Sequence, residues 1–379
     1  MSGGRATGGA GPQAGWPGGG EPEAIGFAVV GLGMGRHHCR SIREARGAEL
    51  IAVCDIDAGR REKAAQEFGC KAYASVDELL ADPQVQVVNV AVPTGLHAAV
   101  GVKVAQSGRH VICEKPLDVN LEQADSLIAA CRDHGVKLAS IFQRRLQPLS
   151  RLVKETIESG RLGPLHYADI HLYWYRADSY YAGGNPPGWR GTFALDGGGA
   201  CMNQGIHSID LISWLAGGVR TVYARTGTFT HQIEAEDVGT VLVTFRNGAL
   251  GNITCTTSAY PGLTNDLHIL GSKGSIVISD DRVVTWRIKR EDGDEGAEKA
   301  EEEELRARFG GSSGSGAADP LAVGFDGHTV HVEDMVQAIR EGREPVIAGT
   351  DARHAVEICV AIQQSAATGR EITLSGDPS

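Results

Sequence analysis

The chain has 379 residues, of which 42% are hydrophobic and 22% are charged, and its formal net charge is −11. That length is typical of two domains rather than one, with enough apolar material for a core in each. The negative charge excludes a general nucleic-acid binder, because no surplus of basic side chains remains to neutralise phosphates. No apolar run approaches the length of a bilayer span, so we expect no membrane partner.

The eight cysteines are scattered, and none forms a Cys-x-x-Cys pair or a Cys/His ligand cluster. Most lie inside apolar runs, which is typical of small buried hydrophobic side chains. We therefore expect no metal site and a reducing, cytoplasmic setting. Residues 1–22 are rich in glycine and lack the apolar centre of a secretory signal, so they are predicted to be a disordered tail.

Residues 23–145 alternate short apolar runs with helical patterns, as expected for an α/β domain. Continuous apolar runs suit parallel strands that helices cover on both faces. Strand–helix alternation implies right-handed crossovers and therefore a doubly wound, Rossmann-type parallel sheet. The predicted strands are residues 25–30, 50–54, 85–92, 110–113 and 137–141.

Residues 146–379 show a different pattern. Apolar and polar residues alternate between 167 and 175, and Asn247-Gly248 is a strong hairpin signal. The pattern predicts a C-terminal α+β domain with a largely antiparallel open sheet and helices on one face, the other face being a candidate oligomer interface. Residues 289–319, first acidic and then rich in glycine and serine, are predicted to be a mobile surface insertion.

The first predicted strand runs into a glycine-rich loop, Gly31-Leu-Gly33-Met-Gly35. The first glycine permits a positive φ angle, and the second lets the backbone approach a pyrophosphate. The following helix offers free N–H groups and the positive end of its dipole. The third glycine comes one residue earlier than in the usual G-x-G-x-x-G spacing, and a tight structural turn is the competing interpretation. Met34 and Arg36 belong to the same candidate cofactor loop.

The second predicted strand is followed by Asp55. A carboxylate at this distance from the glycine loop accepts a hydrogen bond from the adenosine ribose 2′-hydroxyl and repels a 2′-phosphate. It therefore favours NAD over NADP. Arg60 and Arg61 lie near enough to help bind a phosphate, so NADP stays open. A helix or turn cap is the competing role for Asp55.

Two more predicted strands end in polar residues, and ligands of open α/β sheets bind at the carboxyl ends of the strands. Pro93, Thr94 and His97 follow the third predicted strand, and Glu114 and Lys115 follow the fourth. We expect all five beside the cofactor. Lysine is rarely buried unless paired and its pKa shifts readily, so Lys115 is a candidate catalytic residue. A structural contact between Lys115 and Glu114 is the alternative.

Together these segments resemble the glucose–fructose oxidoreductase/inositol dehydrogenase/rhizopine-catabolism family, shortened to Gfo/Idh/MocA. The likeness extends from about residue 25 to the end, except for the acidic insertion. It implies a Rossmann domain, a C-terminal α+β domain with an open sheet, NAD(P)-linked oxidation or reduction of sugar and cyclitol hydroxyls, and frequent dimers or tetramers. It rests on the loop from Gly31 to His38, Pro93-Thr94 with His97, Glu114-Lys115-Pro116, Gln143-Arg144-Arg145-Leu-Gln-Pro148, Trp189-Arg190, and the segment from Asp196 to Asp210 that contains Asn203 and His207.

The resemblance implies that Lys115 is the catalytic lysine and His207 the catalytic histidine. Asn203 stands where many members have an aspartate. An aspartate raises the pKa of a nearby histidine, whereas an amide only hydrogen-bonds. Either His207 works with Lys115 alone, or another acid compensates. Asp210 lies one helical turn from His207, although a structural contact is the more ordinary role for it.

Further contacts are expected from residues around this pair. Arg144 and Arg145 are candidates to bind substrate hydroxyls, carboxylate or phosphate, with an internal ion pair as the alternative for one of them. Gln143, Trp189 and Arg190 are predicted to edge the nicotinamide pocket. These residues lie in the segments that carry the family resemblance, so their predicted roles rest on that resemblance.

The sequence therefore predicts an NAD(P)-dependent oxidoreductase. It is expected to transfer a hydride between the nicotinamide and a secondary hydroxyl of a polyol, sugar, cyclitol or nucleotide sugar, with Lys115, Asn203 and His207 around that hydroxyl. A homodimer or homotetramer is expected. Two alternatives stay open: an NAD-dependent glycoside hydrolase that works by transient oxidation, and a non-catalytic NAD-binding sensor.

Overall fold

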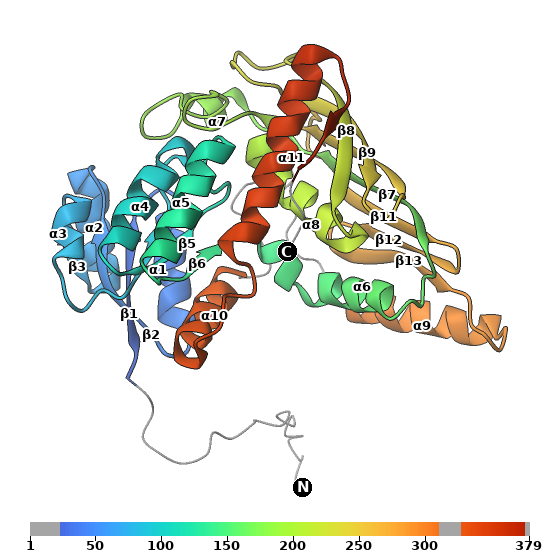
Figure 1. Ribbon diagram of the computed structural model, residues 1–379, viewed down its shortest axis with the longest axis horizontal. Coiled ribbons are helices and arrows are strands. Elements are labelled where there is room, and N and C mark those ends of the chain that lie inside the picture. The colour runs from blue at the N-terminus through green and yellow to red at the C-terminus, as the bar shows by residue number, and fades with distance from the viewer. Residues whose placement is uncertain (1–22, 311–326, 376–379) are drawn as a thin grey trace, which may run out of the picture.

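The computed structural model describes residues 23–310 and 327–375, which form two sheets with helices packed around them (Figure 1). The predicted tail and residues 311–319 of the predicted insertion lie outside the described residues. The N-terminal sheet is on the left of Figure 1 and the C-terminal sheet on the right, and α11 (Gly349–Thr368) runs between them. The predicted pairing of an α/β domain with an α+β domain is confirmed.

The first sheet has six parallel strands in the order β3-β2-β1-β4-β5-β6. This is the Rossmann order, and its switch point lies between β1 and β4. The short edge strand β3 was missed from the sequence because none of its three residues is buried. The strands are β1 (Ile25–Val30), β2 (Ala48–Cys54), β3 (Lys71–Tyr73), β4 (Val87–Val90), β5 (His110–Cys113) and β6 (Leu138–Ser140). The helices between them are α1 (Gly35–Glu44), α2 (Ala58–Phe68), α3 (Val76–Leu80), α4 (His97–Gln106) and α5 (Leu121–Asp133).

The second sheet has eight strands in the order β13-β12-β11-β7-β10-β9-β8-β14. Strands β7 and β10 run parallel, and the other neighbouring pairs are antiparallel. Alternate residues of β7 are fully buried in the core beside α8, which leaves the other face of the sheet open. The strands are β7 (Leu165–Tyr173), β8 (Val219–Gly227), β9 (Val238–Phe245), β10 (Leu250–Thr256), β11 (Asn265–Gly271), β12 (Gly274–Ser279), β13 (Arg282–Ile288) and β14 (Ile372–Thr373). The helices between β6 and β8 are α6 (Pro148–Glu158), α7 (Asp178–Ala182) and α8 (Ile206–Ala216).

The acidic run forms a helix, so the loop expected over this part of residues 289–319 is wrong. Helix α9 (Glu295–Arg308) lies against β13. Its Glu302 is 5% exposed and accepts hydrogen bonds from the Trp286 backbone N–H at 3.1 Å and from Arg287 Nε at 2.8 Å. Leu305, one turn later, is also buried. The buried Glu302 carboxylate and its hydrogen-bond partners anchor this helix. The sequence pattern did not predict the helix because it contains few apolar residues.

Helix α10 (Gly327–Glu341) corrects the expected division of the chain at residue 146. Its Val332, Met335 and Val336 are buried in one cluster with Phe27 and Val29 of β1. This helix therefore completes the Rossmann domain, although it follows most of the second domain in sequence. Local periodicity predicted the apolar stripe of α10 but not the sheet that it covers.

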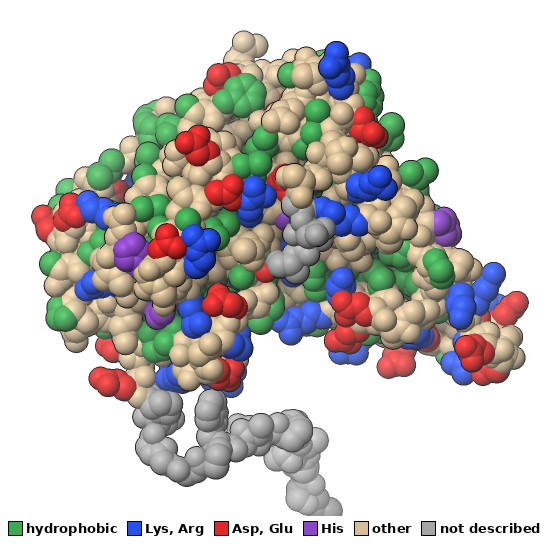
Figure 2. All heavy atoms as spheres, in the orientation of Figure 1, with side chains coloured by type: hydrophobic (Ala, Val, Ile, Leu, Met, Phe, Trp, Pro, Cys, Tyr) green, Lys and Arg blue, Asp and Glu red, His purple; other side chains and the backbone are tan. Residues whose placement is uncertain are grey.

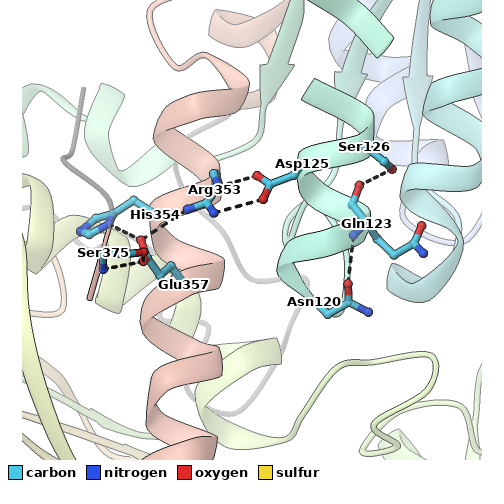
Figure 3. Close-up of polar contacts among 8 residues, drawn as sticks. All are labelled: Asn120, Gln123, Asp125, Ser126, Arg353, His354, Glu357 and Ser375. Carbon is cyan, nitrogen blue, oxygen red and sulfur yellow. Dashed lines mark hydrogen bonds and ion pairs between the residues drawn. The ribbon is translucent and has the colours of Figure 1, made fainter. Parts of the chain in front are cut away.

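Helix α11 ties the two halves together, as Figure 3 shows. Arg353 pairs with Asp125 of α5, its Nη2 lying 3.1 Å from Oδ2. One turn further, Glu357 accepts hydrogen bonds from the backbone N–H and the hydroxyl of Ser375 at 3.0 and 2.9 Å. The helix thus contacts the Rossmann domain through Arg353 and anchors the C-terminal strand region through Glu357.

Among the described residues, none of the helices combines the length and the apolar character needed to cross a membrane. On the face shown in Figure 2, acidic and basic side chains are intermixed.

Candidate active site

The glycine loop has the geometry that a dinucleotide needs. Gly31 has a φ of 89°, and an added Cβ would lie 2.6 Å from the carbonyl oxygen of Ala91. An added Cβ on Gly33 meets nothing within 4 Å, so open space lies over the loop there. An added Cβ on Gly35 would lie 2.8 Å from a methyl of Val29. The three glycines thus serve the turn, the open approach and the helix–strand packing despite the short spacing, and the residues present fit a bound pyrophosphate.

Asp55 supports this loop from the end of β2. Its Oδ2 accepts the backbone N–H of Leu32 at 2.7 Å, and its Oδ1 accepts that of Asp57 at 2.8 Å. Arg61 donates to the Asp55 carbonyl at 2.7 Å, so its guanidinium is held by the protein. Arg36 is paired with Glu67. The carboxylate therefore lies at the loop as predicted, and its contact with a ribose stays a prediction.

His97 does not have the role expected for it. Its ring is 1% exposed, and its Nδ1 and Nε2 lie 2.7 and 2.8 Å from the carbonyl oxygens of Pro116 and Val92. Burial lowers the pKa of this histidine. With both ring nitrogens against backbone, His97 braces the ends of β4 and β5 and has no atom left for a cofactor. Thr94 is also buried, in the short turn after Pro93.

Glu114 is likewise occupied within the protein. Its Oε1 lies 2.8 Å from Nε2 of His38 on α1 and 3.3 Å from Nε2 of His328 on α10, and its Oε2 accepts the Lys115 backbone N–H at 3.1 Å. Burial opposes the charge, but the hydrogen bonds from His328 and His38 outweigh it and hold the pKa of Glu114 well below 4.5. The expected cofactor contact of Glu114 is therefore replaced by a positioning role, in which it fixes the backbone at Lys115.

Lys115 reaches from the end of β5 into the second domain. Its Nζ donates to the backbone carbonyl of Asn203 at 2.8 Å. Burial lowers the pKa of Lys115, although the charges of Glu114 and Asp196 oppose the shift. The structural contact weighed as an alternative, between Lys115 and Glu114, is formed through the backbone N–H of Lys115 and not through its ammonium. Instead the ammonium lies at the π-helical turn Ala200–Gly205, just before α8.

His207 lies in the first turn of α8, beside the same turn. Burial and the charge of Lys115 hold its pKa well below 6.5, so the ring is neutral at physiological pH. Its Nδ1 is buried and has no hydrogen-bond partner among the described residues. The ring packs edge-on against Phe142 at 5.7 Å between centroids. A buried imidazole nitrogen without a hydrogen-bond partner is unusual in a folded protein, and it marks His207 as a candidate functional residue.

The acid that accompanies this pair is Asp196, to which sequence reasoning gave no role. Asn203 donates its side-chain amide to Asp196 Oδ1, and the Gly191 backbone N–H donates to Oδ2 at 2.7 Å. Asp196 is 1% exposed, and burial raises its pKa to about 6. Its position in the glycine-rich segment before Asn203 was the only signal. Residue 203 itself has no carboxylate, but Asp196, which contacts Asn203, supplies one.

Asp210, the acid considered from the sequence, is instead part of a closed ion pair. Arg145 Nε lies 2.8 Å from Asp210 Oδ2, and its Nη1 lies 3.3 Å from Asp351. The expected substrate role of Arg145 is therefore wrong, and the internal ion pair weighed beside it is confirmed. Arg144 donates to Ser208 Oγ at 2.9 Å and contacts Asp281. Its charge also lowers the pKa of the neighbouring His207.

Two more arginines and a tyrosine extend the polar network around Asn203. The Tyr180 hydroxyl donates to Asn203 Oδ1 at 3.3 Å, and Arg190 lies over the Tyr180 ring with its Cζ 4.5 Å from the centroid. The same guanidinium lies over the Trp189 ring, with its Cζ 5.1 Å from the centroid. Arg176, which is 2% exposed, donates to Gln204 Oε1 at 2.8 Å. Of these residues, sequence reasoning found Trp189 and Arg190, whereas Arg176 and Gln204 had no local motif.

Gln143 lies at the junction of β6 and α10, where an added Cβ on Gly327 would be 2.2 Å from its Cβ. Its side-chain oxygen is buried without a partner among the described residues. Its predicted place at the nicotinamide pocket stays a prediction, as does that of Trp189 and Arg190.

The chain combines a Rossmann domain, which has an open glycine loop, with a second domain that places a neutral histidine near a buried lysine. This combination defines a two-domain, NAD-binding oxidoreductase. The comparisons agree. Residues 25–142 match the family model described as an oxidoreductase family with an NAD-binding Rossmann fold, and residues 150–277 match the GFO/IDH/MocA C-terminal domain. The chain belongs to the GFO/IDH/MocA family of oxidoreductases.

Relatives with named activities span nearly the whole chain. Myo-inositol 2-dehydrogenase of Thermotoga maritima is 27% identical over 92% of this chain and 98% of its own length. The scyllo-inositol 2-dehydrogenase (NAD(+)) of Bacillus subtilis is 26% identical over 92% and 95%. The crystal structure of the WlbA dehydrogenase from Bordetella pertussis, in complex with NADH and UDP-GlcNAcA, is 31% identical with a TM-score of 0.81, covering 94% of this chain and 100% of that one.

Proposed function

We propose that this oxidoreductase oxidises a secondary hydroxyl on the ring of an anionic sugar, as a nucleotide sugar or a sugar acid, with NAD as the oxidant. The observation that carries the proposal is the meeting of Lys115 with the turn before His207, across the two domains. The substrate class follows from charge. Three basic side chains, those of Lys115, Arg176 and Arg190, lie near two carboxyl groups, Glu114 and Asp196, and burial raises the pKa of Asp196 to about 6. A solved relative at 31% identity holds a nucleotide sugar acid with NADH.

The chain's own residues supply the proton chemistry. The substrate hydroxyl donates to an imidazole nitrogen of neutral His207, which accepts the proton as the alcohol becomes a carbonyl. Lys115 donates to the same oxygen and stabilises the charge that develops there. Asp196 acts through Asn203, whose carbonyl holds the Lys115 ammonium. When bound, NAD supplies the acceptor for the hydride that leaves the carbon.

The test is the absorbance of reduced nicotinamide with purified protein, NAD⁺ or NADP⁺, and a panel of nucleotide sugar acids, sugar acids, neutral sugars and inositols. We expect turnover with an acidic sugar and with NAD⁺ in preference to NADP⁺. Turnover with inositols or neutral sugars alone would contradict the charge argument. Release of an aglycone without net change in the cofactor would point to the hydrolase alternative.

We further propose a homo-oligomer in a reducing, cytoplasmic setting. Leu242 and Leu250 on the open face of the second sheet are 59% and 60% exposed, which is typical of an interface. All eight cysteines are unpaired in the structure. Light scattering on the purified protein measures the oligomer directly, and a monomer would contradict this expectation.

A further inference from the structure

Three side chains with metal-binding atoms gather on the open face of the second sheet. Asp169 and His171 are two residues apart on β7, so they point to the same side of the sheet. His268 on the neighbouring strand β11 is paired directly with Asp169. Their neighbours on β7, Ala168 and Ile170, are fully buried on the opposite side. The group therefore lies on the face away from the core and from α8.

The ligand atoms of these three residues converge. Asp169 Oδ1 lies 2.5 Å from His268 Nδ1 and 3.4 Å from His171 Nε2, and all three atoms lie within 4.8 Å of one another. Bonds of about 2.0–2.2 Å to a tetrahedral zinc ion place its ligand atoms roughly 3.3 Å apart. Small side-chain rotations therefore suffice to admit an ion. Two imidazoles with one carboxylate are a donor set for zinc or a similar transition ion, and not for Mg²⁺ or Ca²⁺, which prefer all-oxygen sites.

The surroundings also suit an ion. The Tyr173 hydroxyl lies 3.2 Å from His171 Nδ1, so it holds the ring with Nε2 toward Asp169, as an outer-shell partner does. The hydroxyl can accept as well as donate, so it also tolerates the tautomer that a metal requires. In the single chain, the side chains of His171 and His268 are 22% and 34% exposed.

We propose that Asp169, His171 and His268 form a binding site for one Zn²⁺ ion per chain, which clamps β7 to β11 on the open face. The prediction of no metal site rested on the cysteines and on linear spacing. This group is assembled instead by strand pairing, with His268 lying 99 residues from Asp169 in sequence. Three hydrogen-bonded side chains without an ion are the competing arrangement, and direct measurement of zinc separates the two.

The experiment uses the full chain, stripped with a chelator and dialysed. Calorimetric titration with ZnSO₄ and with MgCl₂ is run on wild type and on the variants His171→Ala, His268→Ala and Asp169→Asn. His166→Ala is the matched control, because His166 is an exposed histidine of the same strand outside the group. We expect one tight zinc site in wild type and in His166→Ala, affinity at least 10-fold weaker in the other three, and no response to magnesium.

Two results would overturn the proposal. One is the absence of zinc binding to wild type, and the other is unchanged affinity in both His171→Ala and His268→Ala, which would assign the zinc to other histidines. Circular dichroism of each variant checks that it is folded. Should the variants fail to fold, Co²⁺ added to wild type gives an independent readout. Intense visible bands indicate a tetrahedral site with nitrogen ligands, and their absence contradicts the proposal.

Discussion

The ammonium of Lys115 lies 2.8 Å from the backbone carbonyl oxygen of Asn203, so a residue that follows a Rossmann strand is bound to the turn that precedes His207. The two residues are 88 positions apart in the sequence, and Asn203 lies in the π-helical turn before α8. Because the acceptor is backbone, the contact depends on the shape of the π-helical turn and not on the side chain at 203. The same contact explains how an asparagine at this position is compatible with a well-placed lysine.

Replacing Lys115 by methionine is expected to lower kcat/KM by about 100-fold or more, because no donor remains to stabilise charge on the reacting oxygen. Binding of NADH, measured by fluorescence, should change little, since the glycine loop is untouched. Lys103→Met, at an exposed lysine paired with Asp77, is the control and should retain activity. Unchanged turnover in Lys115→Met would refute the mechanism.

Asp196 gives the activity a dependence on pH. Its pKa of about 6 means that the carboxyl is neutral below that pH and an anion above it, where it supports the charge of Lys115. We expect kcat/KM of wild type to rise with a midpoint near pH 6, and Asp196→Asn to lack this rise. An identical inflection in the variant would assign it to another group.

The same shift predicts a stability effect of defined sign. Burial raises the folded pKa of Asp196 above 3.8, so the folded state holds the proton more tightly than the unfolded state. Stability from this group is present at low pH and is lost as pH rises through about 6. The melting temperature of Asp196→Asn relative to wild type should therefore increase between pH 5 and pH 7, measured by calorimetry. A difference that is independent of pH would contradict the raised pKa.

Gly33→Ala tests the cofactor loop. The new methyl meets no protein atom within 4 Å, so folding should be unaffected, whereas the methyl enters the space left for the pyrophosphate. We expect roughly a 10-fold rise in the Kd for NADH, measured by fluorescence titration. Gly59→Ala on α2 is the matched control and should bind as wild type does. Equal affinity in Gly33→Ala would place the cofactor elsewhere.

Arg145 is expected to matter for stability and not for substrate affinity. Arg145→Ala leaves Asp210, which is 1% exposed, without its partner, and a broken buried pair costs about 3–5 kcal/mol. Urea unfolding measures this loss, and Arg151→Ala at an exposed position of α6 is the control. The variant should keep the KM of wild type under conditions where it is folded. A raised KM at unchanged stability would restore the substrate role.

The sequence by itself determined the two fold classes, the glycine loop and the acid after β2, through local periodicity and through residue types whose chemistry is needed at a strand end. The pairing of Lys115 with His207 was implied by the family resemblance, and its catalytic role stays a prediction. Tertiary structure alone decided which charged groups neutralise one another. It paired Asp210 with Arg145 and placed Asp196 in contact with Asn203. His97 and Glu114 bind other groups of the protein, and α10 packs on the first sheet. The physical reason is that a buried polar group must find a partner, and packing between distant segments selects that partner.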